Sequence, residues 1–351
     1  YITVVSPIKN SPAEQAGLLP QDMILYVDGE TIKGMSANDA VKLIRGEKGT
    51  EVTLTIKRAG VEENFNMTIV RDDIPVETVY GTLDEDKIAH IQITSFSEDT
   101  SNELVRVLAD LEKQGMKAIV LDVRQNPGGF LRAAIEISDL FIPEGKAILQ
   151  TQERNQEPVI YYAEKGTKYD LPLTVLIDGG SASASEILAG ALSESVGVKL
   201  VGETTFGKGT VQGIEYQKDG STLKFTTGKW LTANGNWINE KGIAPTVEVA
   251  YPDYVSLSYV DPATEYKIGS TEQAVSSAER IFEVLGYAVG EVDNVFDEAT
   301  KAAVSKFQND NELEVTGILT GETTFKLLET LSGYVKENDP QLMKAKELVK
   351  P

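Results

Sequence analysis

Two nearly unbroken apolar runs constrain the fold of this 351-residue chain more than any other feature. Residues 117–124 (KAIVLDVR) and 171–178 (LPLTVLID) do not alternate between apolar and polar positions, which is typical of strands buried on both faces of a sheet. Each run ends in a glycine pair, at 128–129 and 179–180, and residues with helical spacing follow. This alternation of strands and helices over residues 73–258 predicts an α/β fold with strand-end loops available for chemistry.

Composition excludes several classes of function. The chain has 33 Lys and Arg against 54 Asp and Glu, a formal net charge of −21, so it repels phosphate backbones and we expect no nucleic-acid partner. It has no cysteine, which excludes thiol proteases, CxxC redox chemistry and cysteine zinc sites. We find no signal peptide and no apolar run of about 18 residues that could span a bilayer. Tyr1 stands in mid-strand, so we expect a piece of a longer chain whose remainder could carry a targeting segment or anchor.

A serine-rich segment after the second apolar run supplies a candidate nucleophile. The sequence GGSASASEI places Ser183 at the start of a helix, where unpaired amides and the positive end of the helix dipole lie. The amide of Ala184 there could stabilise an oxyanion, with a second amide from Gly128 or Gly129 in the neighbouring strand-end loop. Ser183 with Glu186 three residues later is also a capping box, which is a purely structural alternative.

We expect a lysine, rather than a histidine, to accept the serine proton. The single histidine, His90, lies in an alternating strand pattern over residues 87–96, which is typical of a structural position. Lys208 has a glycine on each side and shares a face with Gln212, which could hold its amine. A lysine is a base only when neutral, so it needs burial and no close carboxylate; Glu203, the nearest acid in sequence, points to the other face of a strand. The structural alternative is a solvated lysine in a glycine-rich turn.

Residues 1–72 resemble a PDZ domain of the bacterial type. The resemblance rests on the segments SPA, AGL and DMI, on the Asp-Gly turn that follows them, and on a predicted helix at 36–45. PDZ domains bind the carboxyl terminus of a peptide by adding it as a strand between a sheet edge and a helix. The family's N-terminal strands and carboxylate loop would precede the first residue, so the resemblance implies only the helix wall of the groove. That wall comprises Ala40, Val41 and Ile44.

Residues 268–333 resemble the small helical peptidoglycan-binding module of cell-wall enzymes. The resemblance rests on three segments within residues 284–328, although Asp-Asn replaces the usual Asp-Gly. Asp297 and Thr320 are predicted helix N-caps. A three-helix scaffold for dimerisation would need the same caps and apolar positions, so both peptidoglycan binding and homodimer formation stay open. A final helix within 334–351 begins with Asp and Pro.

The order of these segments resembles the carboxyl-terminal processing proteases, also called tail-specific proteases, and most of all the CtpB type of Gram-positive spore formers. The resemblance implies a crotonase-like, ClpP-like serine protease core whose access the PDZ unit gates. It implies that Ser183 is the nucleophile, Lys208 the general base and Gln212 its orienting partner. Ser181 and Ser185 are less favoured nucleophiles.

The same resemblance implies an ATP-independent serine endopeptidase that needs no metal or cofactor. Its substrate would be an extracytoplasmic protein or peptide with a free, often apolar, carboxyl terminus, and its role would lie in sporulation signalling. We also expect a homodimer.

Two other functions fit the same core, namely a non-catalytic ligand-binding or scaffold protein and an enzyme acting on acyl thioesters. Retention of both Ser183 and Lys208 argues against the first, and the two accessory modules fit the second poorly. We therefore predict an α/β, multidomain chain with a partial PDZ domain at 1–72, a Ser–Lys protease core at 73–258, a helical module at 268–333 and a C-terminal helix at 334–351.

Overall fold

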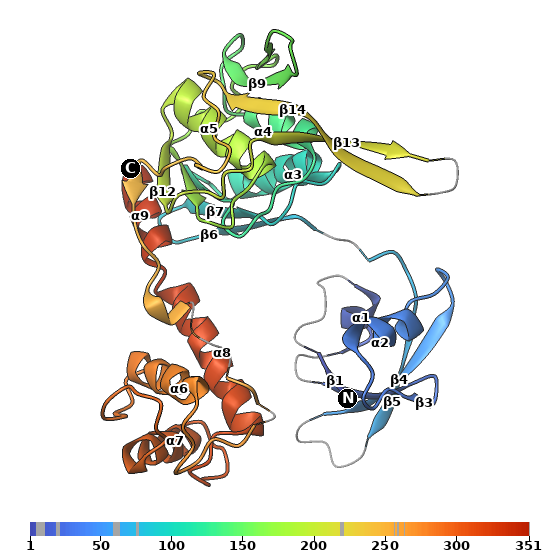
Figure 1. The fold of residues 1–351 in the computed structure, drawn as a ribbon, viewed down its shortest axis with the longest axis vertical. Helices are drawn as coiled ribbons and strands as arrows, with labels where there is room; N and C mark the ends of the chain where they lie inside the picture. The colour runs from blue at the N-terminus through green and yellow to red at the C-terminus, as the bar shows by residue number, and fades with distance from the viewer. Residues whose placement is uncertain are drawn as a thin grey trace. The chain divides into compact units, whose positions relative to one another are not determined.

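The computed structural model describes residues 1–4, 11–18, 22–58, 64–74, 77–217, 221–255, 257, 260–262 and 264–350. The chain folds as two compact units, Tyr1–Glu77 and Thr78–Pro351 (Figure 1). The division lies close to the predicted domain boundary at residue 72. Among the described residues, no helix combines the length and the apolar character that crossing a bilayer requires.

The first unit is an antiparallel sheet with two helices. The sheet has the order β1-β2-β4-β5, with β3 paired to β2. Asp28 and Gly29 both have positive φ, 49° and 81°, which confirms the predicted tight turn between β2 and β3. The elements are β1 (Ile2–Thr3), α1 (Pro12–Gln15), β2 (Met23–Val27), β3 (Glu30–Thr31), α2 (Ala37–Ile44), β4 (Glu51–Lys57) and β5 (Phe65–Val70).

Helix α2 confirms the predicted helix but corrects one of its predicted groove residues. Ser36 caps it by accepting a hydrogen bond from the Asp39 amide. Ala40 is fully buried in the core of this unit, so it does not line a groove. Val41 is 39% exposed and Ile44 is half-buried, so the exposed part of this wall begins at Val41.

The second unit is built around a six-stranded sheet of order β15-β12-β11-β8-β7-β6, parallel except for the β6–β7 pair. The two apolar runs form its central strands, β8 and β11, as predicted. The strands are β6 (Val79–Leu83), β7 (Ile88–Ile93), β8 (Ala118–Asp122), β11 (Leu173–Ile177), β12 (Lys199–Gly202) and β15 (Val247–Glu248).

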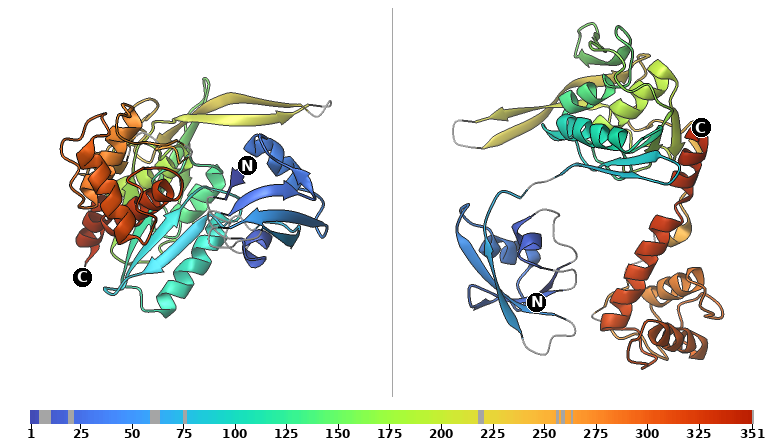
Figure 2. Two further views of the ribbon diagram at one scale, coloured as in Figure 1. Left: turned by 90° about the horizontal axis from the view of Figure 1, so that it is seen from below. Right: turned by 180° about the vertical axis from the view of Figure 1, so that it is seen from behind.

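Both faces of this sheet are covered. Helices α3 (Thr100–Lys113), α4 (Leu131–Ser138) and α5 (Ala184–Val196) lie on one side of the sheet (Figure 2, right). Ile119 and Leu121 of β8 pack in the core that these helices share with the sheet. Ala118 and Val120 pack on the opposite face against helix α9 (Pro340–Val349), close to the end of the chain. A strand buried on two sides must be largely apolar, which accounts for the unbroken apolar pattern of residues 118–121.

A second, antiparallel sheet of order β10-β9-β14-β13 contacts α5 through β9 and β14. The β13–β14 hairpin extends beyond the rest of this sheet (Figure 1). The strands are β9 (Ala147–Glu153), β10 (Val159–Tyr162), β13 (Thr210–Tyr216) and β14 (Thr222–Thr232).

Three helices, α6 (Gln273–Val284), α7 (Glu298–Asp310) and α8 (Gly321–Glu337), enclose a separate small core. Asp297 caps α7 by accepting hydrogen bonds from two amides, as predicted. Thr320 stands at the N-cap position of α8, but its hydroxyl donates to the Pro262 carbonyl instead of capping the helix. The predicted boundary at 333/334 lies inside α8, which continues to Glu337.

Arg124 joins the returning helix α9 to the strand-end loop after β8. Its guanidinium donates two hydrogen bonds to Asp122, at 2.9 and 2.6 Å, and pairs with Asp339 at 2.8 Å. It also donates to Gln341, whose amide in turn donates to the Val249 carbonyl at 2.8 Å. The chain leaves the core after Val249 and returns at Asp339, so this cluster holds both ends of the inserted helical module.

His90 belongs to the same cluster. Its Nε2 lies 2.9 Å from Asp122 Oδ2, and the ring is not among the residues that line the main cavity. Burial alone would raise the pKa of Asp122, but the hydrogen bonds from His90 and Arg124 outweigh it and lower that pKa to about 2. The histidine therefore has the structural position that its strand pattern predicts.

Replacing Arg124 by Gln should lower the free energy of unfolding by about 3–5 kcal/mol, because it leaves buried carboxylates without their cation. Both tryptophans, Trp230 and Trp237, lie in the second unit, so urea unfolding followed by tryptophan fluorescence reports on that unit. The control Lys346→Gln removes a partly exposed pair with Asp84 and should cost at most about 1 kcal/mol. Equal losses in the two variants would contradict the assigned role of Arg124.

Acid should weaken the same cluster. The folded-state pKa of Asp122 lies below the unfolded value of about 3.9, so its ionised form stabilises the fold above that pH and the contribution disappears as pH falls toward 2. Between pH 5 and pH 3 the wild type should therefore lose about 1 kcal/mol more unfolding free energy than Asp122→Asn. Urea titrations at both pH values measure this difference, and parallel losses would show that Asp122 is not the titrating group.

Candidate active site

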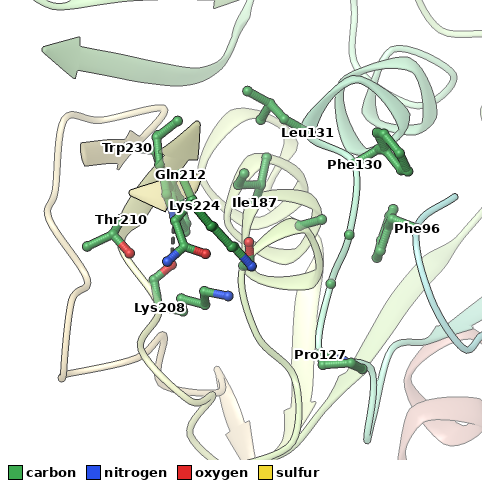
Figure 3. Close-up of a pocket in the computed structure, with 15 residues that line it drawn as sticks. Phe96, Pro127, Phe130, Leu131, Ile187, Lys208, Thr210, Gln212, Lys224 and Trp230 are labelled. Carbon is green, nitrogen blue, oxygen red and sulfur yellow. Dashed lines mark hydrogen bonds between the residues drawn. The ribbon is translucent and has the colours of Figure 1, made fainter. Parts of the chain in front are cut away.

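A cavity of about 520 Å³ lies where the start of α5, the loop after β8 and the β13–β14 hairpin meet (Figure 3). It brings together six residues that the sequence analysis singled out from three separate segments. They are Gly128, Gly129, Ser183, Ala184, Lys208 and Gln212.

Of the three clustered serines, Ser183 alone lines this cavity. Ser181 and Ser185 are fully buried, and their hydroxyls donate to the carbonyls of Val123 and Asn126 at 2.8 and 2.9 Å. Those hydrogen bonds fix the loop and leave neither hydroxyl available as a nucleophile.

The backbone of Ser183 is strained. It has φ 55° and ψ −111°, whereas an ordinary N-cap residue is extended. A non-glycine residue at positive φ costs free energy and persists only where its surroundings enforce it, and such residues cluster at active sites. Helix capping alone therefore does not account for this residue.

The fully buried carboxylate of Glu186 enforces the arrangement. Its Oε2 accepts hydrogen bonds from the backbone amides of Ser183 (2.8 Å) and Lys208 (2.9 Å). Its Oε1 accepts from the Gly207 amide (2.7 Å) and the Thr205 hydroxyl (2.6 Å). Glu186 thus forms half of the expected capping box and also ties the Lys208 loop to the start of α5, a role that the local motif did not reveal.

The two glycines beside Lys208 pack against the chain itself. Gly207 has φ 88°, and a Cβ added there would lie 2.8 Å from the Gly242 amide nitrogen. A Cβ on Gly209 would lie 2.9 Å from the backbone nitrogen of Asn239. Glycine is needed because this loop passes directly over residues 239–242.

Lys208 is half-buried on the cavity wall. Within the described part of the chain its hydrogen bonds are made by the backbone, from its amide to Glu186 and from Trp230 Nε1 to its carbonyl at 2.8 Å. Glu203 accepts instead from the Tyr251 amide, so it does not pair with the lysine amine. The amine and the Ser183 hydroxyl share the cavity without a direct hydrogen bond between them in the described residues.

Gln212 is exposed and lines the same cavity. It lies on β13 beside an irregularity in pairing between Val211 and Gln212, which re-aims side chains at that point. Among the described residues its carboxamide forms no hydrogen bond with the Lys208 amine, so its orienting role stays a prediction.

The glycines after β8 lie against the start of α5. Gly128 and Gly129 have φ of 95° and 151°, and a Cβ on Gly128 would lie 2.8 Å from the Ala184 nitrogen. The Gly128 amide already donates to Asn126 Oδ1 at 2.9 Å. Of the two glycines left open by the sequence, Gly129 is therefore the better source of a second oxyanion donor beside Ala184.

Aromatic and aliphatic side chains form much of the remaining wall (Figure 3). Among the residues that the structure describes, no group of three His, Asp or Glu side chains is placed to hold a metal ion. The apolar part of the wall comprises Phe96, Phe130, Leu131, Ile187 and Trp230.

The chain matches three family models. Peptidase family S41 matches residues 87–249, a PDZ domain matches 3–58, and a putative peptidoglycan binding domain matches 271–327. These matches agree with the order of the predicted units.

Curated relatives match almost the whole chain. The carboxy-terminal processing protease CtpA of Bacillus subtilis (strain 168) is 49% identical over 349 residues, covering 99% of this chain and 74% of that protein. CtpB of the same strain is 40% identical over 350 residues, covering 98% and 73%. The chain is thus more similar to this CtpA than to the CtpB type that the sequence analysis named.

A solved structure, a putative S41 protease from Bacteroides fragilis NCTC 9343, shares the fold at 20% identity and a TM-score of 0.50, with 73% of this chain and 74% of that chain covered. Fold, motifs and relatives agree, and the chain belongs to peptidase family S41, the serine peptidases that include the carboxy-terminal processing proteases.

Proposed function

We propose that this chain is a Ser–Lys endopeptidase that cleaves extracytoplasmic proteins near their carboxyl-terminal tails. The main support for the proposal is that the Glu186 carboxylate accepts hydrogen bonds from the backbone amides of both Ser183 and Lys208, two residues that line one cavity. Membership of a peptidase family favours this function over a non-catalytic scaffold and over an enzyme of acyl thioesters.

The mechanism uses the neutral amine of Lys208 as a general base. It takes the proton of Ser183 Oγ as that oxygen attacks the peptide carbonyl, while the amides of Gly129 and Ala184 donate to the oxyanion. Lys208 then gives its proton to the leaving amine, and a water molecule activated by the same lysine hydrolyses the acyl-enzyme. Hydrogen bonds between such groups often shorten only when substrate is bound, and Gln212 would then orient the amine.

The cavity wall offers the Lys208 amine no acidic partner, since among the described residues that line the cavity there is no Asp or Glu. The carboxylate of Glu186 contacts the Lys208 segment through the backbone amides of Gly207 and Lys208.

The accessory units support a tail-directed peptidase. A PDZ unit, whose helix wall includes the exposed Val41 and the half-buried Ile44, would bind a substrate carboxyl terminus and gate access to the site. The apolar wall around Phe96 and Ile187 would accept an apolar side chain beside the scissile bond.

The helical module is proposed to bind peptidoglycan or to form a homodimer, and a peptidoglycan ligand would place the enzyme outside the cytoplasm. A role in sporulation signalling has less support than proteolysis. It came from the CtpB resemblance, and CtpA is the more identical of the two Bacillus subtilis relatives.

Ser183→Ala and Lys208→Ala should each reduce casein digestion by about a thousandfold or more, because each removes one partner of the proton transfer. Ser193→Ala on the same helix and Lys199→Ala on β12 are matched controls and should keep wild-type rates. Circular dichroism and tryptophan fluorescence should show that all four variants are folded. Wild-type activity in either Ser183→Ala or Lys208→Ala would overturn the assignment.

Glu186→Gln should lower kcat about 10- to 100-fold with little change in KM. The amide cannot accept all four hydrogen bonds, and the loss of one or two buried bonds is worth about 1–3 kcal/mol. Since Glu186 does not line the cavity, substrate affinity should persist. Glu194→Gln, on the same helix and bonded to the Asn234 amide, is the control. A change in KM alone, or activity within twofold of wild type, would show that Glu186 does not position the two segments.

A further inference from the structure

Lys224, which the sequence analysis did not single out, is a second lysine on the wall of the same cavity. Among the described residues, the cavity is lined by two lysines and by no Asp or Glu, although the whole chain has 54 acidic residues against 33 basic ones. Even with Lys208 neutral, as the proposed mechanism requires, a wall that keeps Lys224 and has no acidic residue among those described is a local reversal of the chain's net negative charge. Such a wall attracts an anionic group.

The strand register directs Lys224 toward the site. Side chains alternate along β14, so Lys224 and Thr226 project from one face of the hairpin while Phe225 projects from the other. Gln212 stands opposite Thr226 in the β13–β14 pairing, so it shares that face. Figure 3 shows the Lys224 side chain pointing from the hairpin into the cavity.

Lys224 has no acidic partner in the part of the chain that the structure describes, since none of the ion pairs found there includes it. Lys208 acts only when neutral, so it cannot serve as a fixed positive charge in the proposed mechanism. Lys224 is then the cation that the cavity offers to a substrate. A lysine ammonium on a flexible stem binds a carboxylate by a charge-assisted hydrogen bond.

We propose that Lys224 recognises a carboxylate of the bound peptide and so contributes to substrate selection. This inference rests on the proposed peptidase function. The carboxylate comes either from the free carboxyl terminus of the substrate or from an Asp or Glu side chain close to the scissile bond, and the chemistry at Lys224 is the same for both.

The test compares three peptides that share one apolar core sequence. The first ends in a free carboxylate, the second ends in a carboxamide, and the third ends in a carboxamide but has Glu in place of Gln near the scissile bond. Lys224→Met removes the charge and keeps the stem, and Lys199→Met removes an equivalent charge from β12 as a control.

Binding is measured first by fluorescence anisotropy with Ser183→Ala, which keeps the peptides intact. Adding Lys224→Met to this variant should lower the affinity for one or both carboxylate-bearing peptides about tenfold, which corresponds to the loss of one charge-assisted hydrogen bond. The affinity for the neutral peptide should not change. The PDZ unit is identical in the compared variants, so its own affinity for carboxyl termini cancels.

Kinetics give the second readout. With Ser183 present, Lys224→Met should raise KM for the same carboxylate peptides about tenfold with kcat within twofold, and the difference should shrink as salt is raised. Loss confined to the free-acid peptide identifies the terminal carboxylate as the ligand, and loss confined to the Glu peptide identifies a side-chain carboxylate. An equal effect on all three peptides, or no effect on any, overturns the proposal.

The two proposals fail differently. If the wild-type chain and Ser183→Ala were equally inactive, the proposed peptidase function would be wrong. The binding comparison would still decide whether Lys224 selects carboxylates. If the wild type cleaves all three peptides and Lys224→Met changes none of their affinities, the peptidase function is supported and the proposed role of Lys224 is wrong.

Discussion

The buried carboxylate of Glu186 is the interaction on which the rest of the site depends. Ser183 and Lys208 are separated along the chain by helix α5, strand β12 and a loop. Four hydrogen bonds to one side chain place both segments against each other. Because these donors are backbone amides and a hydroxyl, the link fixes position without placing a carboxylate against the lysine amine.

The surrounding fold keeps that link dry and rigid. Helix α5 begins with a strained serine and continues through a fully buried apolar stretch between two sheets, so its first turn cannot shift to relieve the strain. The loop after β8 approaches the same turn through glycines that leave no room for side chains. Packing thus holds the hydroxyl, the amides and the lysine at one wall, where electrostatic stabilisation requires fixed donors.

Local sequence patterns predicted the elements better than they predicted the contacts. The two apolar strands, the Asp-Gly turn and the Asp297 cap depend on residues close to one another in sequence, and the structure contains each of them. Whether Ser181, Ser183 or Ser185 faces the cavity depends on neighbours more than 50 residues away, at Val123 and Asn126. For the same reason the pattern could not show Lys224 at the site, because its position follows from hairpin register.

The contacts of helix α9 also depend on residues far away in sequence, and they bear on the order in which the protein can fold. Its residues stand beyond a separately folded module, yet they cover one face of the central sheet and complete the Arg124 cluster beside the strand-end loop. A ribosome releases the chain from its amino terminus, so this one face of the sheet stays uncovered until the residues up to Val349 have emerged. The site therefore acquires its full structural support only after the helical module that precedes α9 has been synthesised.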